Sequence, residues 1–127
     1  MIRTAKELTA MVLYTFKRCK TCKNAKEWLK ENGFEFTEKD LEFDFPSEEE
    51  LRELIKKSGR DAEYFSNTTG HLFIAAGLKH DFPTMTEDER IHIISVDGQL
   101  IRRPLLIDGD TILAGFSKRA WEKALLR

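Results

Sequence analysis

Two cysteines, Cys19 and Cys22, stand three residues apart in the segment Cys19-Lys20-Thr21-Cys22, and the chain contains no further cysteine. A thiol pair at this spacing can close into a disulfide, bind a metal or pack as two small apolar side chains. A thiolate attacks disulfides and other electrophiles, whereas a protonated thiol is a poor nucleophile. The pair is therefore the first candidate for a functional site.

Cys19 follows a predicted strand and stands at the expected start of a helix. The unpaired N–H groups at a helix start carry partial positive charge, which favours a thiolate. We therefore predict a lowered pKa for Cys19, which makes it the nucleophile, and we assign Lys17 and Arg18 to substrate binding. Cys22 lies almost one turn deeper and is the predicted resolving thiol. Four cations are close in sequence, at Lys17, Arg18, Lys20 and Lys23.

Two other interpretations of the thiol pair remain open. A structural zinc site needs about four ligands, and the chain offers no second cysteine pair. Its three histidines, His71, His80 and His92, are scattered along the sequence. The alternative without chemistry is that both cysteines are small buried apolar residues. Both interpretations carry less weight than a reactive dithiol, and no metal is expected.

The composition suits one compact domain. The chain has 127 residues, 41% of them hydrophobic, and a net charge of −1, so nothing draws it towards nucleic acid. No apolar run approaches the roughly 18 residues that span a bilayer, and the first ten residues lack the apolar stretch of a signal peptide. We therefore expect a cytoplasmic protein without membrane or direct nucleic-acid binding, and a monomer.

The first part of the chain is typical of a strand, a helix and a second strand. Val12–Phe16 is the first predicted strand, and residues 1–10 before it are interpreted as an extension. A helix carries Ala25, Trp28 and Leu29 at helical spacing and stops near Gly33. Phe34–Lys39 alternates as a second strand. A crossover of this kind makes the two strands parallel.

Helices are predicted for the middle of the chain. Two capping boxes, Ser47 to Glu50 and Thr86 to Glu89, each begin a helix, and residues 71–76 form a short helix before Gly77. The last third contains strands at 105–107 and 111–114 with a hairpin turn at Asp108-Gly109. A final helix capped by Ser117 carries Trp121, Leu125 and Leu126.

The order βαβ, helices, ββα predicts an α/β fold of thioredoxin or glutaredoxin type. The sheet is expected to be mixed and four-stranded, with a helical lobe inserted at about residues 44–97. The whole of residues 1–127 is predicted to be one domain.

The sequence resembles the ArsC/Spx family of arsenate reductase-like proteins and Spx-type redox regulators. The resemblance runs from Met11 over nearly the whole chain. Its motifs are Leu13-Tyr14 with Cys19-Lys20-Thr21-Cys22-Lys23-Asn24-Ala25 and Trp28-Leu29, then Ala76-Gly77-Leu78, and finally Arg102-Arg103-Pro104-Leu105-Leu106-Ile107-Asp108 with Gly115-Phe116. The order and spacing of these motifs make the resemblance specific.

The resemblance implies a glutaredoxin-like fold with Cys19 as the nucleophile. It also implies that Pro104 is a cis-proline facing the thiol, and that Arg103 contacts an anionic substrate or the thiolate. A plain surface cation is the alternative for Arg103. The loop Asn67-Thr68-Thr69-Gly70 is either a polar lip of the cleft, with Asn67 and Thr68 binding substrate, or a helix-capping turn.

The chain departs from the glutathione-dependent arsenate reductases that it resembles. Those enzymes use one essential thiol and three arginines, of which Arg103 alone has a clear counterpart here. The middle arginine falls on Asn67, and the last falls near Gly115-Phe116. Losing contacts of about 1.5–3 kcal/mol each disfavours arsenate binding. The additional thiol, Cys22, favours dithiol chemistry.

Three functions follow as hypotheses. The favoured one is a thiol-dependent oxidoreductase that reduces disulfides or mixed disulfides rather than arsenate, with no bound cofactor and with glutathione, another small thiol or a thioredoxin-type protein as reductant. The second is a redox-sensing regulator that binds the RNA polymerase alpha C-terminal domain, although the chain lacks an extended basic tail. The third is an interaction module with inert thiols.

Overall fold

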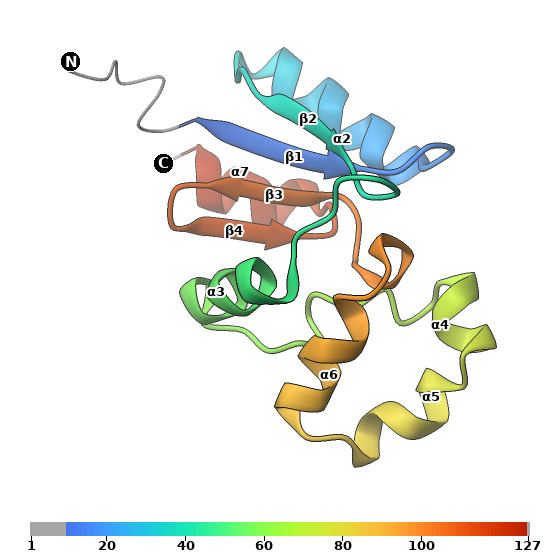
Figure 1. Cartoon of the computed structure of the whole chain (residues 1–127). Coiled ribbons are helices and arrows are strands. Elements are labelled where there is room, and N and C mark those ends of the chain that lie inside the picture. Colours follow the sequence, from blue (N-terminus) through green and yellow to red (C-terminus); the bar gives the residue numbers. More distant parts are fainter. Residues whose placement is uncertain (1–9, 127) are drawn as a thin grey trace. The chain divides into compact units, whose positions relative to one another are not determined.

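The computed structural model describes residues 10–126 and divides the chain into two compact units (Figure 1). Among the described residues, one unit holds residues 10–39 and 103–126, and the other holds Asp40–Arg102. The predicted extension at residues 1–10 lies outside the described residues except for Ala10. None of the helices within residues 10–126 is long and apolar enough to cross a membrane.

The first unit is built on a four-stranded mixed sheet in the order β2-β1-β3-β4. Strand β1 (Met11–Thr15) pairs antiparallel with β3 (Leu105–Asp108), which pairs antiparallel with β4 (Thr111–Ala114). Strand β2 (Thr37–Asp40) flanks β1 on its other side, and their arrows run the same way in Figure 1. The predicted thioredoxin-like mixed sheet is confirmed.

The predicted hairpin between the last two strands is also confirmed. Asp108 pairs with Thr111, so the connection has two residues, Gly109 and Asp110. Gly109 has a φ of 61°, which a residue without Cβ adopts at little cost. Asp108 ends the strand instead of standing in the turn.

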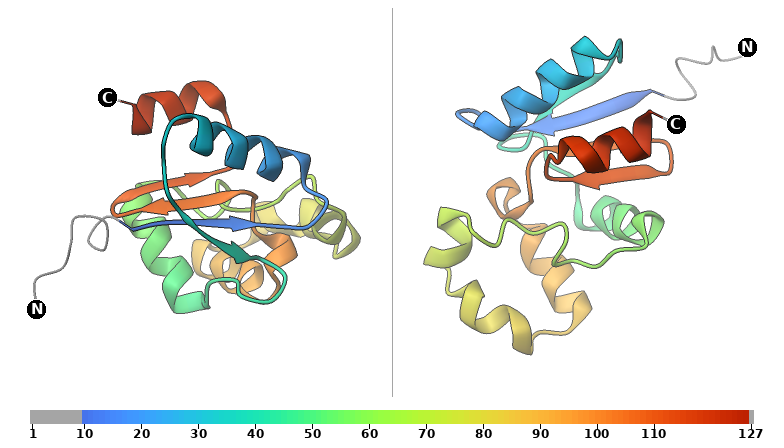
Figure 2. Two further views of the ribbon diagram at one scale, coloured as in Figure 1. Left: turned by 90° about the horizontal axis from the view of Figure 1, so that it is seen from above. Right: turned by 180° about the vertical axis from the view of Figure 1, so that it is seen from behind.

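Helices α2 (Lys20–Glu31) and α7 (Lys118–Leu125) cover one face of this sheet (Figure 2). Trp28 of α2 and Trp121 of α7 are buried, with ring centroids 6.0 Å apart in an edge-on arrangement. They pack against Leu13 and Leu106, which project from the strands. The apolar residues that were predicted for both helices therefore form one core, and this core holds α2 against the sheet.

Strand β2 begins three residues later than predicted. Phe34 stacks on Trp28 with centroids 6.1 Å apart, and Phe36 packs against the same core. Alternation of these aromatics imitates a strand, but their burial against α2 holds them outside the ladder. The final helix also ends earlier than predicted, because Leu126 is its exposed C-cap residue.

The second unit is helical. Its elements are α3 (Glu48–Ser58), α4 (His71–Ala75), α5 (Leu78–Asp81), the 3-10 helix η1 (Phe82–Thr84), α6 (Glu87–Ile94) and the 3-10 helix η2 (Gly98–Leu100). Both predicted capping boxes are present, at the starts of α3 and α6. Gly59 ends α3 with a φ of 70°, a conformation that glycine adopts readily at the end of a helix.

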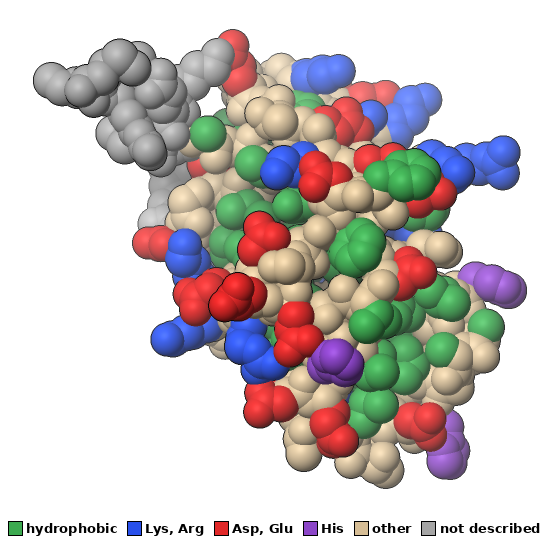
Figure 3. All heavy atoms as spheres, in the orientation of Figure 1, with side chains coloured by type: hydrophobic (Ala, Val, Ile, Leu, Met, Phe, Trp, Pro, Cys, Tyr) green, Lys and Arg blue, Asp and Glu red, His purple; other side chains and the backbone are tan. Residues whose placement is uncertain are grey.

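Charges are mixed on the surface. Figure 3 shows acidic and basic side chains interspersed on one face, in keeping with the net charge of −1. Arg52, for example, bonds Glu48 at 3.0 Å and also pairs with Asp88. Such exposed pairs contribute little to stability.

Candidate functional site

Cys19 and Cys22 lie at the start of α2 and form a disulfide with their Cα atoms 5.2 Å apart. Cys19 is the N-cap residue of the helix, and its sulfur accepts a hydrogen bond of 3.1 Å from the backbone N–H of Cys22. Helix N-caps are normally oxygen acceptors such as Ser or Asp. A sulfur in this place accepts from an otherwise unpaired N–H, which also stabilises negative charge on it.

The two sulfurs differ in exposure. Cys19 is half-buried, whereas Cys22 is 2% exposed. A substrate disulfide can therefore approach Cys19, while Cys22 is within reach of Cys19 and shielded from solvent. A nucleophile must be accessible and a resolving thiol need only reach it, so the greater exposure of Cys19 fits the predicted roles of the two thiols.

The loop before Cys19 has an unusual backbone. Arg18 has a φ of 60°, in the left-handed region that residues with a Cβ rarely adopt. Lys17 and Arg18 are both exposed and precede the N-cap directly. The exposed Arg18 therefore places a positive charge one residue before Cys19.

Arg103 lies against the same loop. Its guanidinium carbon is 4.3 Å from the centre of the Phe16 ring, three residues before Cys19. Burial lowers the pKa of Arg103, and its Nη1 atom is buried with no hydrogen-bond partner among the described residues. The peptide bond between Arg103 and Pro104 is cis, and the Pro104 carbonyl accepts from the N–H of Gly115 at 2.8 Å.

A hydrogen-bonded group behind the site ties three elements of this unit together. The Thr15 hydroxyl donates to Glu38 at 2.6 Å, and Lys26 of α2 contacts the same carboxylate at 3.1 Å. Burial raises the pKa of Glu38, but the hydrogen bonds and the charges of Lys26 and Lys30 outweigh it and hold the pKa below its usual range. The group fixes α2 against β1 and β2.

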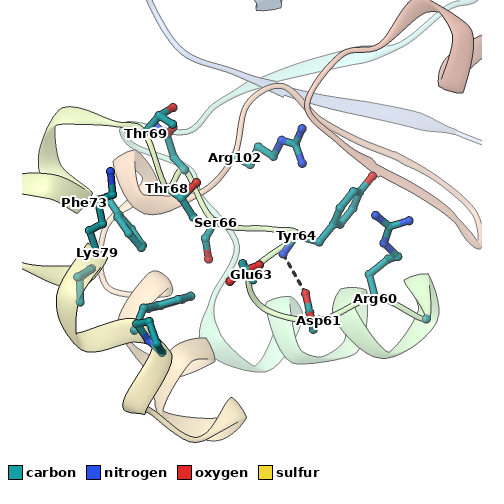
Figure 4. A pocket seen from close by; sticks show the side chains of 15 residues that line it. Arg60, Asp61, Glu63, Tyr64, Ser66, Thr68, Thr69, Phe73, Lys79 and Arg102 are labelled. Atoms are coloured by element: carbon teal, nitrogen blue, oxygen red, sulfur yellow. Dashed lines mark hydrogen bonds between the residues drawn. The ribbon is translucent and has the colours of Figure 1, made fainter.

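The other two predicted site residues, Asn67 and Thr68, belong to the helical unit. Asn67 holds a turn, since its amide donates to the Gln99 carbonyl at 3.3 Å and its backbone N–H donates to Leu100 at 2.8 Å. Thr68 is exposed. Both line a pocket of this unit (Figure 4). The structure thus groups Cys19, Cys22, Lys17, Arg18, Arg103 and Pro104 in one unit, and Asn67 and Thr68 in the other.

Sequence reasoning missed several residues that shape these places. Phe16 supports Arg103, and Tyr64 lies between two arginines in the helical unit. Arg60 and Tyr64 are four residues apart, a spacing that signals contact on a turn or helix. No signal in the sequence joins Phe16 to Arg103 or Tyr64 to Arg102, because the members of each pair are distant along the chain. Within residues 10–126 no three His, Cys, Asp or Glu side chains gather as a metal site.

Comparisons with known proteins agree with this geometry. The protein YusI of Bacillus subtilis is 39% identical over 114 residues, which cover 90% of this chain and 97% of YusI. The global transcriptional regulator Spx 2 of Bacillus anthracis is 27% identical over 117 residues, which cover 92% of this chain and 88% of the regulator.

A solved structure is similar over the same length. The crystal structure of an ArsC family related protein from Bacteroides fragilis superposes with a TM-score of 0.85 at 37% identity, covering 90% of this chain and 96% of the other. The model of the ArsC family matches residues 14–124, a range that includes the dithiol and the Arg103-Pro104 element. The chain therefore belongs to the ArsC family, with a fold of the thiol-oxidoreductase kind.

Proposed function

We propose that this protein is a dithiol oxidoreductase that reduces disulfides or mixed disulfides. The observation that carries the proposal is the asymmetry of the thiol pair: the half-buried Cys19 sulfur caps α2 and accepts the Cys22 N–H at 3.1 Å, while Cys22 itself is buried. A helix N-terminus stabilises a thiolate at the accessible position. The buried partner is protected from outside reagents and placed for the second step.

The reaction balances with two thiols and one disulfide. The Cys19 thiolate attacks one sulfur of the substrate, forming a mixed disulfide and releasing the first substrate thiolate, which takes a proton from solvent. Cys22 loses its proton and attacks the Cys19 sulfur, which forms the intramolecular disulfide and releases the second substrate thiol. Two electrons pass from the protein to the substrate, and two molecules of a small thiol such as glutathione restore the dithiol while forming their own disulfide.

The surroundings of Arg103 favour a substrate that carries negative charge. Its guanidinium is half-buried, stacks on Phe16 and keeps one nitrogen without a partner among the described residues. Guanidinium groups bind carboxylates with paired hydrogen bonds, and peptide thiols such as glutathione carry carboxylates. Arg18 adds an exposed positive charge at the entrance. Reduction of peptide disulfides in the cytoplasm, where small thiols are abundant, is consistent with these charges.

Arsenate is a poorer candidate for the substrate. Three arginines surround the oxyanion in the reductases that the sequence resembles, and here Asn67 and the Gly115-Phe116 pair stand where two of them are expected. The Asn67 amide is bonded to the Gln99 carbonyl. Gly115 has no side chain, and Phe116 packs in the apolar core. One arginine is a weak clamp for a multiply charged oxyanion.

The proposal is tested with a mixed disulfide between glutathione and a short peptide, and in parallel with arsenate. We expect the reduced protein to reduce the mixed disulfide and to leave arsenate nearly untouched. Cys19→Ser should abolish turnover, whereas Cys22→Ser should accumulate a covalent Cys19 adduct visible by mass spectrometry. Thr21→Ser, which lies between the two thiols in the first turn of α2 and leaves both intact, is the matched control and should retain activity. Activity in Cys19→Ser, or arsenate turnover equal to disulfide turnover, would refute the proposal.

A second candidate function is supported by the similarity to Spx proteins over most of their length. In that case the disulfide between Cys19 and Cys22 is a redox switch, and the partner is the RNA polymerase alpha C-terminal domain. A pull-down with that domain, using oxidised and reduced protein and the Cys22→Ser variant, separates the two functions. Binding that depends on the disulfide favours the regulator, and absence of binding in both states removes it.

A further inference from the structure

Two arginines share one aromatic ring in the helical unit. The guanidinium carbon of Arg60 is 4.1 Å from the centre of the Tyr64 ring, and that of Arg102 is 5.5 Å from it. Figure 4 shows the Tyr64 ring between the two guanidinium groups. Arg60 follows Gly59 at the end of α3, and the Arg102 N–H is bonded to the Phe65 carbonyl at 2.8 Å. The backbone on both sides of the ring is therefore fixed.

The charges of these two arginines are not neutralised by the protein. Neither guanidinium has a hydrogen bond or an ion pair with any described residue, and both side chains are exposed. Arg52 and Arg90 of the same unit differ, because Arg52 pairs with Glu48 and Asp88, and Arg90 bonds the Phe82 carbonyl at 2.9 Å. Stacking on an aromatic ring orders a guanidinium without using its N–H donors. The N–H donors of Arg102 are thus left for an anion on the pocket side of the ring, and Arg60 adds its charge from the other side.

The pocket beside these arginines is lined by aromatic residues at its other end. It has a volume of about 1060 Å³. Figure 4 shows Thr68 and Ser66 between the Tyr64 side and the side that carries Phe73 and Lys79. Phe73 and Phe82 are buried aromatic residues at that far end. The pocket therefore runs from two guanidinium groups, past a threonine hydroxyl, to an apolar wall.

Two acidic residues also line the pocket. Asp61 already accepts the backbone N–H of Tyr64 at 3.0 Å, and Glu63 is exposed. Against them stand three cations, Arg60, Arg102 and Lys79, none of which has an ion-pair partner among residues 10–126. The excess charge is positive, and it is concentrated at the ring.

We infer that this pocket binds an organic phosphate monoester. The phosphate oxygens accept from Arg102 and from the Thr68 hydroxyl, and the organic group lies against Phe73 and Phe82. Arg60, on the other side of the Tyr64 ring, adds positive charge and helps to order the ring. A phosphate accepts paired hydrogen bonds from a guanidinium fork. This ligand is additional to the disulfide substrate, because the residues that hold it belong to Asp40–Arg102 and include no thiol.

The test is a titration of the full-length, isotope-labelled protein followed by NMR. The probes are phenyl phosphate, inorganic phosphate and phenol. We expect phenyl phosphate to shift the Arg60 and Arg102 Nε–H signals and the amides of residues 66–69 saturably. Inorganic phosphate should bind about tenfold more weakly, because it lacks the apolar part, and phenol should not bind measurably.

Three variants make the test specific. Arg102→Ala and Tyr64→Leu should each raise the Kd for phenyl phosphate about tenfold, equivalent to about 1.4 kcal/mol, and Arg60→Ala should raise it less. Arg119→Ala removes one exposed charge from α7 of the other unit, and it should leave the Kd unchanged. Thermal unfolding confirms that each variant folds, and Arg102→Gln replaces Arg102→Ala if the latter does not.

These outcomes test the phosphate site independently of the dithiol proposal, because the NMR readout involves no thiol. Equal weakening by Arg102→Ala and Arg119→Ala would show a non-specific charge effect and overturn the site. Equal affinity for phenyl phosphate and inorganic phosphate would overturn the apolar part of the assignment. Absence of saturable shifts at millimolar phenyl phosphate would overturn the whole inference.

Discussion

The guanidinium carbon of Arg103 lies 4.3 Å from the centre of the Phe16 ring. This contact joins the residue before Pro104 to the loop that ends at Cys19, although Phe16 and Arg103 are 87 positions apart in the sequence. The ring orders the guanidinium and leaves its buried Nη1 without a protein acceptor among the described residues. This geometry supports the proposed role of Arg103 in binding an anionic substrate.

Replacing Arg103 by lysine tests that role. Arg103→Lys keeps the positive charge but loses the planar fork and the stacking on Phe16. We expect the second-order rate constant for oxidation of the reduced protein by glutathione disulfide, which carries carboxylates, to fall about tenfold, equivalent to one charge-assisted hydrogen bond of about 1.5 kcal/mol. The value for the neutral disulfide of 2-mercaptoethanol should fall several-fold less. Arg119→Lys is the control, and equal losses on both substrates would contradict substrate binding by Arg103.

The reduced Cys19 thiol should react as a thiolate near neutral pH. The measurement is the rate of alkylation by iodoacetamide against pH in Cys22→Ser, where Cys19 is the single cysteine. We expect the alkylation rate to show an inflection below the ordinary thiol pKa of about 8.5. The helix start and the backbone N–H of residue 22 stabilise the Cys19 thiolate. In the reciprocal variant Cys19→Ser, the buried Cys22 should be alkylated much more slowly. An inflection at or above 8.5 would remove the electrostatic argument.

Glu38 should make stability depend on pH in the acid range. Its pKa is lowered in the folded protein, so it contributes stability above its unfolded value and loses that contribution as pH falls through the folded value. Glu38→Gln should reduce the free energy of unfolding at pH 7 by about 0.5–1 kcal/mol, a small amount because the side chain is partly solvated. The difference from the parent protein should vanish well below about pH 4.

The matched control for Glu38 is Glu53→Gln, which changes an exposed carboxylate on α3. Urea unfolding of both variants at several pH values provides the comparison. If Glu38→Gln and Glu53→Gln show the same pH dependence, the bonds from Thr15 and Lys26 to Glu38 contribute nothing specific.

Gly98 should tolerate no side chain. A Cβ at this position would overlap the Leu41 carbonyl oxygen and press on Phe45. Gly98→Ala must therefore move backbone, and we expect a loss of more than about 3 kcal/mol in the free energy of unfolding. Gly33→Ala has open space but a φ of 78°, and it should lose only about 1 kcal/mol. Similar thermal midpoints for the two variants would show that the close approach is unimportant.

Much of the fold was predictable because its signals are local. The capping boxes at Ser47 and Thr86 need only neighbouring residues to satisfy the first N–H groups of a helix. The two-residue turn after Asp108 depends on a glycine that accepts a positive φ. Phe34 shows the limit of such signals: its alternation with polar residues indicates a strand, but its stacking on Trp28 keeps it outside the sheet.

The sequence alone determined that two thiols stand three residues apart at the start of a helix, because spacing and capping are short-range properties. The tertiary structure decided which sulfur is accessible, that Phe16 supports Arg103, and that Arg102 meets Tyr64 beside Arg60. Burial and contacts between distant residues depend on how the whole chain packs. No short segment of this sequence carries that information.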